Sequence, residues 1–363
     1  MSYVLAALGF AVLIIAHEAG HFAVGKAVGM RVERFSLFFG PLIAKVRRGE
    51  TEYGIGVIPL GGYVKITGMN PHEEIPPEVQ ARAYYNQPVW KRVVTILAGP
   101  AVNILIAFFI IWGLLLADGQ TTYTPNTNVA AVEKASPAAG SLRPGDQVVA
   151  VDGVGGSEAA IHKQIQTHRC AGAQVAGCLA ATPAHITVKR DGRLATLLVR
   201  PRYETEDGQT AMLVGVDFGT NASTTYPSFI GAASDSVSGL WSVTTQTVST
   251  VARIFEPKER KQLSGVVGVY TVTQESVATS AVQTLKVLAL ISLSLGIINL
   301  FPFLPLDGGH VFWALAEKVR GRRIPFSVME RAGMVGFALI LVLFVIGLSN
   351  DISALSGGGL KIH

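Results

Sequence analysis

Long apolar runs separated by polar stretches set the pattern of this chain. Four of these runs, at residues 1–30, 93–117, 283–305 and 331–349, are long enough as helices to cross a hydrocarbon layer of about 30 Å. The pattern therefore predicts a polytopic α-helical membrane protein with about four transmembrane helices.

The composition supports a membrane protein. Of the 363 residues, 49% are hydrophobic and 15% are charged, which is outside the usual range of soluble proteins. The net charge of +5 is modest and the basic residues lie in separate loops, so nucleic-acid binding is not expected. The first run has no basic residue before Val4 and no A-x-A-like cleavage site after its core, which disfavours a secretory signal peptide.

The basic stretch at residues 31–92 has a different periodicity. Short alternating runs between residues 53 and 67, with Pro59 and the pair Gly61-Gly62 fitting a turn, predict a hairpin or small sheet. We expect a membrane-associated β region whose exposed edge could pair with an extended peptide. An ordinary hairpin packed on the membrane surface explains the pattern equally well.

From residue 118 the composition becomes that of a soluble protein. Strand-like stretches and Asp-Gly turns predict an α+β domain at residues 126–202. Its motif S-P-A-A-x-x-L-R-P-G-D-x-V-x-x-V-D-G, starting at Ser136, resembles a bacterial-type PDZ domain, which implies binding of peptide ends by strand addition. Cys170 and Cys178 could form a disulfide if this domain is extracytoplasmic, and two buried free thiols are the alternative.

The remaining segments are assigned by composition and charge. Residues 203–282 are expected to be a linker with an amphipathic helix at 231–255 and a Gly/Val-rich turn at 264–272. Residues 306–330 are expected to be a basic loop. The positive-inside rule places this loop and residues 31–92 in the cytoplasm, with the PDZ-like domain and both termini outside.

The candidate chemistry lies in the first apolar run, which contains His17-Glu18-Ala19-Gly20-His21. Helical residues four apart share a face, so both imidazoles can reach one cation while Glu18 faces a water bound to it. H-E-x-x-H also occurs by chance in soluble proteins. Within an apolar span, however, three ionisable side chains need a compensating partner, and a metal is one. The pattern predicts a zinc hydrolase.

A third ligand is expected where the third run ends. Asp307 follows two prolines and precedes two glycines, and its carboxylate with two histidines would make a catalytic zinc set with one position left for water. The alternatives are a helix N-cap role for Asp307 and a ligand role for His310. Asn103, in the second run, should be hydrogen-bonded to a neighbouring helix or to the site.

Together these motifs resemble the site-2 protease family of intramembrane zinc metalloproteases, and most closely its bacterial regulators of sigma-factor release. The resemblance rests on H-E-A-G-H, on G-V-I-P-L-G-G-Y-V-K from Gly56, on A-G-P-A-V-N ending at Asn103, and on L-D-G-G-H. It implies that a β element with Gly61 and Gly62 presents the substrate as an added strand. The roles that it implies are zinc (Zn2+) binding by His17, His21 and Asp307, general base and acid for Glu18, and substrate positioning or site support for Asn299 and Asn103.

The resemblance also implies a bacterial plasma-membrane location and a substrate cleaved within its membrane span. Such a substrate is a single-pass protein, for example an anti-sigma factor or a signal-peptide remnant, and the PDZ-like domain would bind a peptide end or exclude bulky ectodomains. The chain departs from the family in having one PDZ-like domain where relatives often have two, and in Val266 where a proline is usual. A membrane-anchored zinc peptidase acting on soluble chains and a PDZ scaffold without catalysis remain as alternatives.

Overall fold

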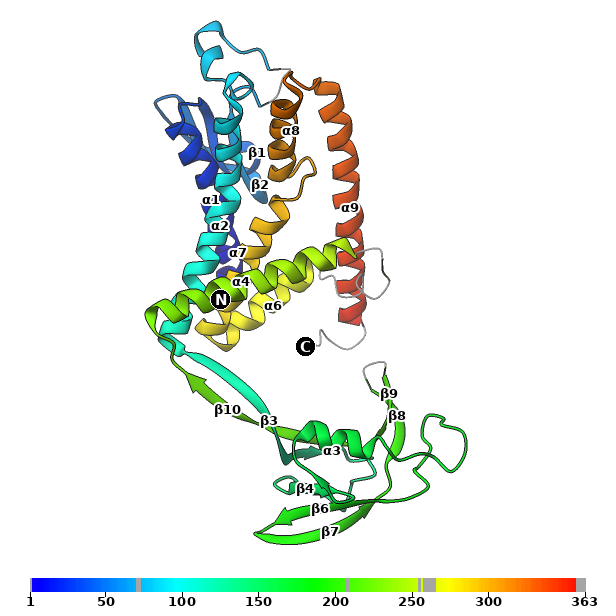
Figure 1. Cartoon of the computed structure of the whole chain (residues 1–363). Coiled ribbons are helices and arrows are strands. Elements are labelled where there is room, and N and C mark those ends of the chain that lie inside the picture. Colours follow the sequence, from blue (N-terminus) through cyan, green and yellow to red (C-terminus); the bar gives the residue numbers. More distant parts are fainter. Residues whose placement is uncertain (1, 70–72, 207–208, 254–255, 257–265, 357–363) are drawn as a thin grey trace. The chain divides into compact units, whose positions relative to one another are not determined.

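The computed structural model describes residues 2–69, 73–206, 209–253, 256 and 266–356. The chain divides into two compact units (Figure 1). Unit 1 comprises Met1–Asp118 and Pro227–His363, and unit 2 comprises Gly119–Tyr226. The described part of unit 1 is mostly helical and that of unit 2 is mostly β-structure.

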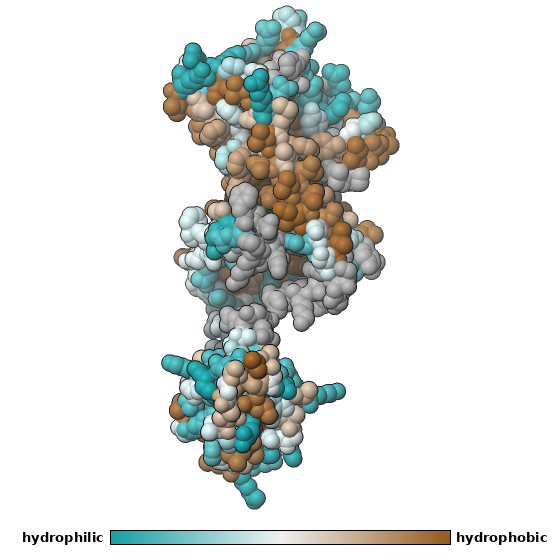
Figure 2. Space-filling model, turned by 90° about the vertical axis from the view of Figure 1, so that its right-hand side faces the viewer, coloured by the Kyte–Doolittle hydropathy of each residue, from teal (hydrophilic) through white to brown (hydrophobic). Residues whose placement is uncertain are grey.

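Four long helices of unit 1 cover most of the predicted apolar runs, although the run expected at 283–305 continues beyond its helix, which ends at Asn299. They are long and apolar enough to cross a membrane over Val4–Ala27, Val89–Asp118, Ala281–Asn299 and Ser327–Ser353. Figure 2 shows a broad area of apolar side chains on one face of this unit, as expected for helices that contact lipid. The helices are α1 (Ser2–Ala27), α2 (Val89–Asp118), α7 (Ala281–Asn299) and α9 (Phe326–Ser356).

Helix α4 (Phe229–Ala252) confirms the helix expected at 231–255, of which residues 254 and 255 lie outside the described chain. The turn expected at 264–272 is wrong for its described part, because α6 (Val266–Thr279) begins there. The Gly268 N–H, one of the amides without a partner inside the helix, donates to Asp351 Oδ2 at 2.9 Å. A carboxylate from a distant helix thus stabilises this helix terminus.

The basic loop expected at 306–330 is also wrong in part, because α8 (Asp307–Arg320) occupies its first half. The helix ends at Gly321, whose φ of 71° is the left-handed conformation common after a helix. Its last turn carries Lys318 and Arg320, which interact favourably with the negative end of the helix dipole. The positive charge that suggested a loop belongs to a helix terminus.

Strands β1 (Val32–Arg48) and β2 (Thr51–Ile66) form the small sheet predicted for this region. The turn between them lies at Gly49-Glu50 rather than at Gly61-Gly62. Leu37 of β1 pairs with Ile55 and also with Gly62, so β2 lies on both sides of β1. This requires β2 to bend, and Gly61, at a φ of 79°, is within the bend.

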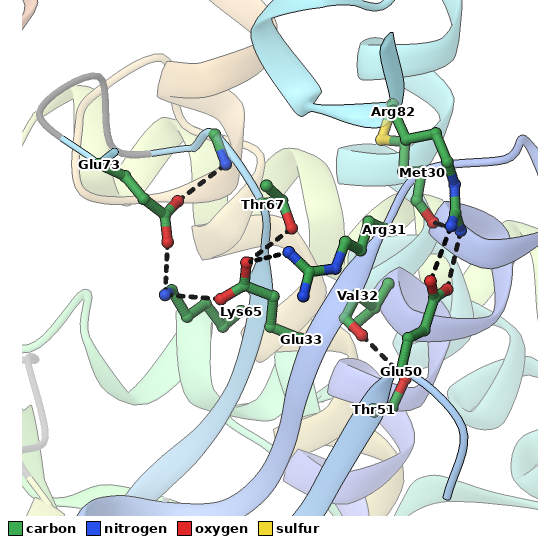
Figure 3. A network of polar contacts seen from close by, with 11 residues as sticks. Met30, Arg31, Val32, Glu33, Glu50, Thr51, Lys65, Thr67, Glu73 and Arg82 are labelled. Atoms are coloured by element: carbon green, nitrogen blue, oxygen red, sulfur yellow. Dashed lines mark hydrogen bonds and ion pairs between the residues drawn. The ribbon is translucent and has the colours of Figure 1, made fainter. Parts of the chain in front are cut away.

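Ion pairs connect the segment after β2, which carries Glu73 and Arg82, to the β1–β2 sheet (Figure 3). Lys65 in β2 forms an ion pair with Glu33 in β1 at 2.7 Å and a second with Glu73. Arg82 donates to both carboxylate oxygens of Glu50 at 2.7 Å. These hydrogen bonds keep the pKa of the Glu50 carboxyl below its usual value. The β1–β2 turn, through Glu50, and the end of β2, through Lys65, are therefore both held by ion pairs.

Unit 2 is an α+β domain built on a six-stranded sheet with the order β10-β3-β4-β6-β7 and β5 beside β4. Helix α3 (Glu158–Ile165) buries Ile161 and Ile165 in the core of this sheet. The predicted end of the domain at residue 202 is wrong, because β10 (Val216–Thr225) pairs with β3 (Gln120–Val132) along most of its length. The other strands are β4 (Gln147–Val151), β5 (Val154–Gly155), β6 (Ala184–Arg190), β7 (Arg193–Val199) and a separate hairpin of β8 (Arg202–Glu206) and β9 (Gln209–Leu213).

The predicted disulfide between Cys170 and Cys178 is present, with the two Cα atoms 6.1 Å apart. Because it closes a short loop, replacing both cysteines by serine should lower the free energy of unfolding of unit 2 by about 2–3 kcal/mol. Thermal unfolding followed by protease resistance of the full-length protein measures this change. A reductant should have the same effect on the native protein and none on the double variant, and equal stability of all samples would contradict the expectation.

Candidate active site

Three side chains from distant parts of the sequence meet in unit 1. His17 and His21 project from α1 and are 6% and 7% exposed. Asp307, the first residue of α8, places Oδ2 at 3.1 Å from His17 Nε2 and 3.2 Å from His21 Nε2. The two Nε2 atoms are 3.2 Å apart. The three residues predicted as ligands therefore lie together, and His310 is not in this group.

The three ligand atoms have the spacing of a tetrahedral site. In tetrahedral coordination with bonds of about 2.0–2.1 Å, ligand atoms are separated by about 3.3 Å. The observed separations of 3.1, 3.2 and 3.2 Å are close to this value. Two imidazoles and one carboxylate are also a donor set of catalytic zinc sites, which keep a fourth position open. The residues present therefore fit a zinc ion.

His21 is oriented by a contact that the sequence did not reveal. Its Nδ1 lies 2.9 Å from the backbone carbonyl of Thr95 in α2. In the tautomer that donates from Nδ1, Nε2 carries a free lone pair directed at the other two ligand atoms. Every residue has a backbone carbonyl, so the sequence alone could not show that Thr95 makes this contact.

Glycines bring α2 against the ligand helix. A Cβ atom on Gly99 would lie 2.2 Å from His21 Nε2, and one on Gly20 would lie 2.5 Å from the Ala98 carbonyl oxygen. No larger residue fits at either position without moving the histidine or the helix backbone. Small residues that permit close approach are typical of helix crossings in membranes. The A-G-P motif of α2 was noted in the sequence, but the role of Gly99 was not.

Asp307 is positioned by the residues that follow it. Cβ atoms on Gly308 and Gly309 would lie 2.2 Å and 2.5 Å from backbone atoms of Leu300 and Leu304, so only glycines let α8 begin against this connection. Leu306, not Asp307, is the N-cap. Further along α8, Glu317 accepts a hydrogen bond from Arg92 of α2 at 2.6 Å, with both side chains only 7% exposed. This buried pair fixes α8 to the helix that orients His21.

The bend of β2 lies beside Glu18. A Cβ atom on Gly62 would be 2.5 Å from Glu18 Cγ, and one on Gly61 would be 2.9 Å from the Phe39 ring. The two glycines predicted to contact substrate thus bring the sheet directly against the carboxylate predicted as general base.

The two asparagines occupy different positions. Asn103 in α2 is fully buried, and neither polar atom of its amide has a hydrogen-bond partner among the described residues, so the side-chain hydrogen bond to a neighbouring helix that the sequence suggested is not formed. The contact with α7 uses its backbone instead, because Ser292 Oγ donates to the Asn103 carbonyl at 2.8 Å. Gly296 permits this close packing, since a Cβ there would lie 3.1 Å from the Pro100 carbonyl. Asn299 is the half-buried last residue of α7.

Comparison with known proteins identifies the family of this chain. The model of Peptidase family M50 matches residues 5–343, which include nearly all of α1, the whole of α2, unit 2 and α7, and the first part of α9. The chain belongs to peptidase family M50. The resemblance to site-2 proteases and the prediction of a peptidase are thereby confirmed.

Individual relatives align with nearly the whole chain. Zinc metalloprotease Rip1 of Mycolicibacterium smegmatis is 31% identical over 381 residues, covering 93% of this chain and 91% of Rip1. A relative from Brucella suis biovar 1 is 30% identical over 370 residues, covering 94% of this chain and 93% of its own. A relative from Rhizobium meliloti is 29% identical over 365 residues, covering 95% and 94%. This M50 peptidase and each of these relatives therefore align over more than nine-tenths of their lengths.

Proposed function

We propose that the chain is an intramembrane zinc metalloprotease that hydrolyses a peptide bond within the transmembrane segment of a single-pass membrane protein. One observation carries the proposal. The trio of His17, His21 and Asp307 converges on α1, a helix long and apolar enough to cross a bilayer, so the chemistry would take place at membrane depth.

Each residue of the site would have a separate role in the reaction. His17, His21 and Asp307 would hold zinc, which when bound polarises a carbonyl and acidifies water. Glu18, one position round the helix from His17, would take a proton from the attacking water and return it to the leaving amine. The Thr95 carbonyl keeps His21 in the tautomer that leaves Nε2 free as a ligand.

A substrate helix must open before it can be cut. Its carbonyls are engaged in its own hydrogen bonds, and unsatisfied backbone groups are costly in a bilayer. The β2 bend at Gly61 and Gly62 would offer replacement hydrogen bonds by strand addition, beside Glu18. Asn299 would contact the opened segment. Asn103 is fully buried, so its part would be to support the packing of α2 on α7.

We assign the protein to the plasma membrane of a bacterium. The basic residues at 31–92 and at the end of α8 would be cytoplasmic. The PDZ-like unit 2 and both termini would then be extracytoplasmic. The Cys170–Cys178 disulfide supports this orientation, because disulfides persist mainly in oxidising compartments.

The alternatives are less well supported. A membrane-anchored peptidase for soluble chains would need its metal site outside the apolar helix, whereas His17 lies inside a candidate span. A scaffold without catalysis needs neither Glu18 nor a convergent trio. The proposed substrate class, such as an anti-sigma factor or a signal-peptide remnant, follows from the family resemblance.

The test is cleavage of a tagged single-span reporter by purified protein in liposomes. We expect a cut inside the reporter's span, located by mass spectrometry, which stops on chelation with 1,10-phenanthroline and returns when zinc is added back. Empty liposomes with reporter are the control. A cut confined to the soluble part of the reporter, or one that persists in the chelator, would reject the proposal.

A further inference from the structure

A buried ion pair joins two helices that contribute to different sides of the predicted metal site. Arg92, near the start of α2, donates from Nη2 to Glu317 Oε2, near the end of α8, at 2.6 Å, and each side chain is 7% exposed. Further along α2, the Thr95 carbonyl orients His21, while α8 begins with Asp307. The pair therefore connects the helix that orients one predicted ligand to the helix that carries another.

Both members of the pair have a second contact. Oε1 of Glu317 accepts a hydrogen bond at 3.4 Å from the N–H of Ile324, in the segment that follows α8. The guanidinium of Arg92 lies over the buried ring of Tyr84, 5.9 Å from the ring centroid. Because each side chain is engaged on two sides, the ion pair defines one position of α8 relative to α2.

The pair is a poor source of stability. Taking two charges out of water is costly, and replacing a buried ion pair by apolar side chains of similar volume is often neutral or stabilising. Arg92 Nε is also buried without a hydrogen-bond partner among the described residues. Apolar packing already attaches α8, because Val311 packs against a cluster that includes Ile96 of α2. Apolar attraction has no direction, however, whereas a hydrogen-bonded ion pair fixes how two helices are aligned.

The metal site tolerates little movement of α8. Distances from zinc to its ligands vary by only about 0.2 Å. Since Asp307–Arg320 is one continuous helix, a shift of its end along the axis also moves Asp307. A slip by one residue would amount to about 1.5 Å. Asp307 Oδ2 would then leave its place at 3.1 and 3.2 Å from the two histidine nitrogens.

We propose that Arg92 and Glu317 are positioning residues of the zinc site. Their ion pair sets the position of α8 against α2 and thereby places the Asp307 carboxylate at ligand distance from His17 and His21. The proposal rests on the ligand set assigned above. Glu317 lies about 15 Å along the helix axis from Asp307, so the pair acts on the metal through α8 and not by contact.

The experiment compares Arg92→Met/Glu317→Leu with the native protein, both full-length and in detergent micelles. Because no charge is left unpaired, the double variant should unfold thermally at the native temperature or above it. Its zinc affinity, measured by competition with a chelating dye, should still fall about tenfold, within the two- to thirtyfold range typical of coupling to a distant site. The visible absorption of bound Co2+, which reports the arrangement of the ligands, should change as well.

Two other variants serve as references. Arg190→Met/Asp146→Leu removes an ion pair of unit 2 in the same way, and it should leave the zinc affinity and the Co2+ spectrum native. Asp307→Ala removes a predicted ligand, and it should weaken zinc binding more than Arg92→Met/Glu317→Leu does. If Asp307→Ala binds zinc with native affinity, the ligand set is wrong and the proposal fails with it.

The positioning role can also fail by itself. Native zinc affinity and a native Co2+ spectrum in Arg92→Met/Glu317→Leu, with the expected loss in Asp307→Ala, would overturn the role of the pair and leave the ligand set intact. A loss of zinc affinity that is accompanied by a matching loss of thermal stability would also overturn it, because the pair would then serve the fold in general.

Discussion

Glu18→Gln is expected to lower the rate of reporter cleavage by about a hundred- to ten-thousandfold, the range by which general acid–base catalysis accelerates proton transfer. Glutamine has the shape of glutamate and still fits against Gly62, but it cannot accept the proton of the attacking water. Zinc content, measured by mass spectrometry of the purified protein, should be unchanged, because His17, His21 and Asp307 are intact.

The control for this variant is Glu330→Gln, which makes the same chemical change at an exposed position of α9. It should cleave at the native rate. If Glu18→Gln retains native cleavage with full zinc, Glu18 is not the base. If instead zinc is lost along with activity, Glu18 contributes to the metal site itself.

Gly99→Ala is expected to abolish cleavage by displacing a ligand rather than by removing one. The new methyl group would be 2.2 Å from His21 Nε2, and the ring cannot turn away without breaking its hydrogen bond to the Thr95 carbonyl. Loss of such support commonly costs about 10–100-fold in metal affinity. We expect a fall of at least this size in zinc affinity, measured by competition with a chelating dye, with a parallel loss of cleavage.

Gly113→Ala is the matched control, since it lies in the same helix and its added Cβ has no neighbour within 4 Å. Both substitutions raise helix propensity by about 1 kcal/mol. A difference between them therefore reports the contact with His21 and not the stability of α2. Native zinc affinity in Gly99→Ala would contradict the described packing.

Several features could be predicted from the sequence because their physical signal is local. A helix that crosses a bilayer needs about 20 apolar residues in succession, and α1, α2, α7 and α9 each carry such a run. The ligand positions His17 and His21 follow from helical spacing. The meeting with Asp307 was a prediction from chemistry, since two histidines need a third donor, and the structure brings these atoms together.

Other features depend on contacts between distant residues and had no local signal. β10 has a Thr-, Asn- and Ser-rich sequence and is a strand because β3, nearly a hundred residues earlier, pairs with it. α6 is rich in β-branched residues with low helix propensity, and Asp351 stabilises its beginning. The close approach of Gly99 to His21 and of Gly62 to Glu18 depends on the packing of whole elements.

The contact between His17 and Asp307 spans 290 positions of the chain. During synthesis the amino-terminal helix is made first, and Asp307 leaves the ribosome only after α7 has been translated. A nascent or truncated chain that ends before α8 has both histidines but not the carboxylate, and it also lacks Glu317, the buried partner of Arg92. The three predicted ligands are therefore present together only late in biogenesis, when most of the polypeptide has been synthesised.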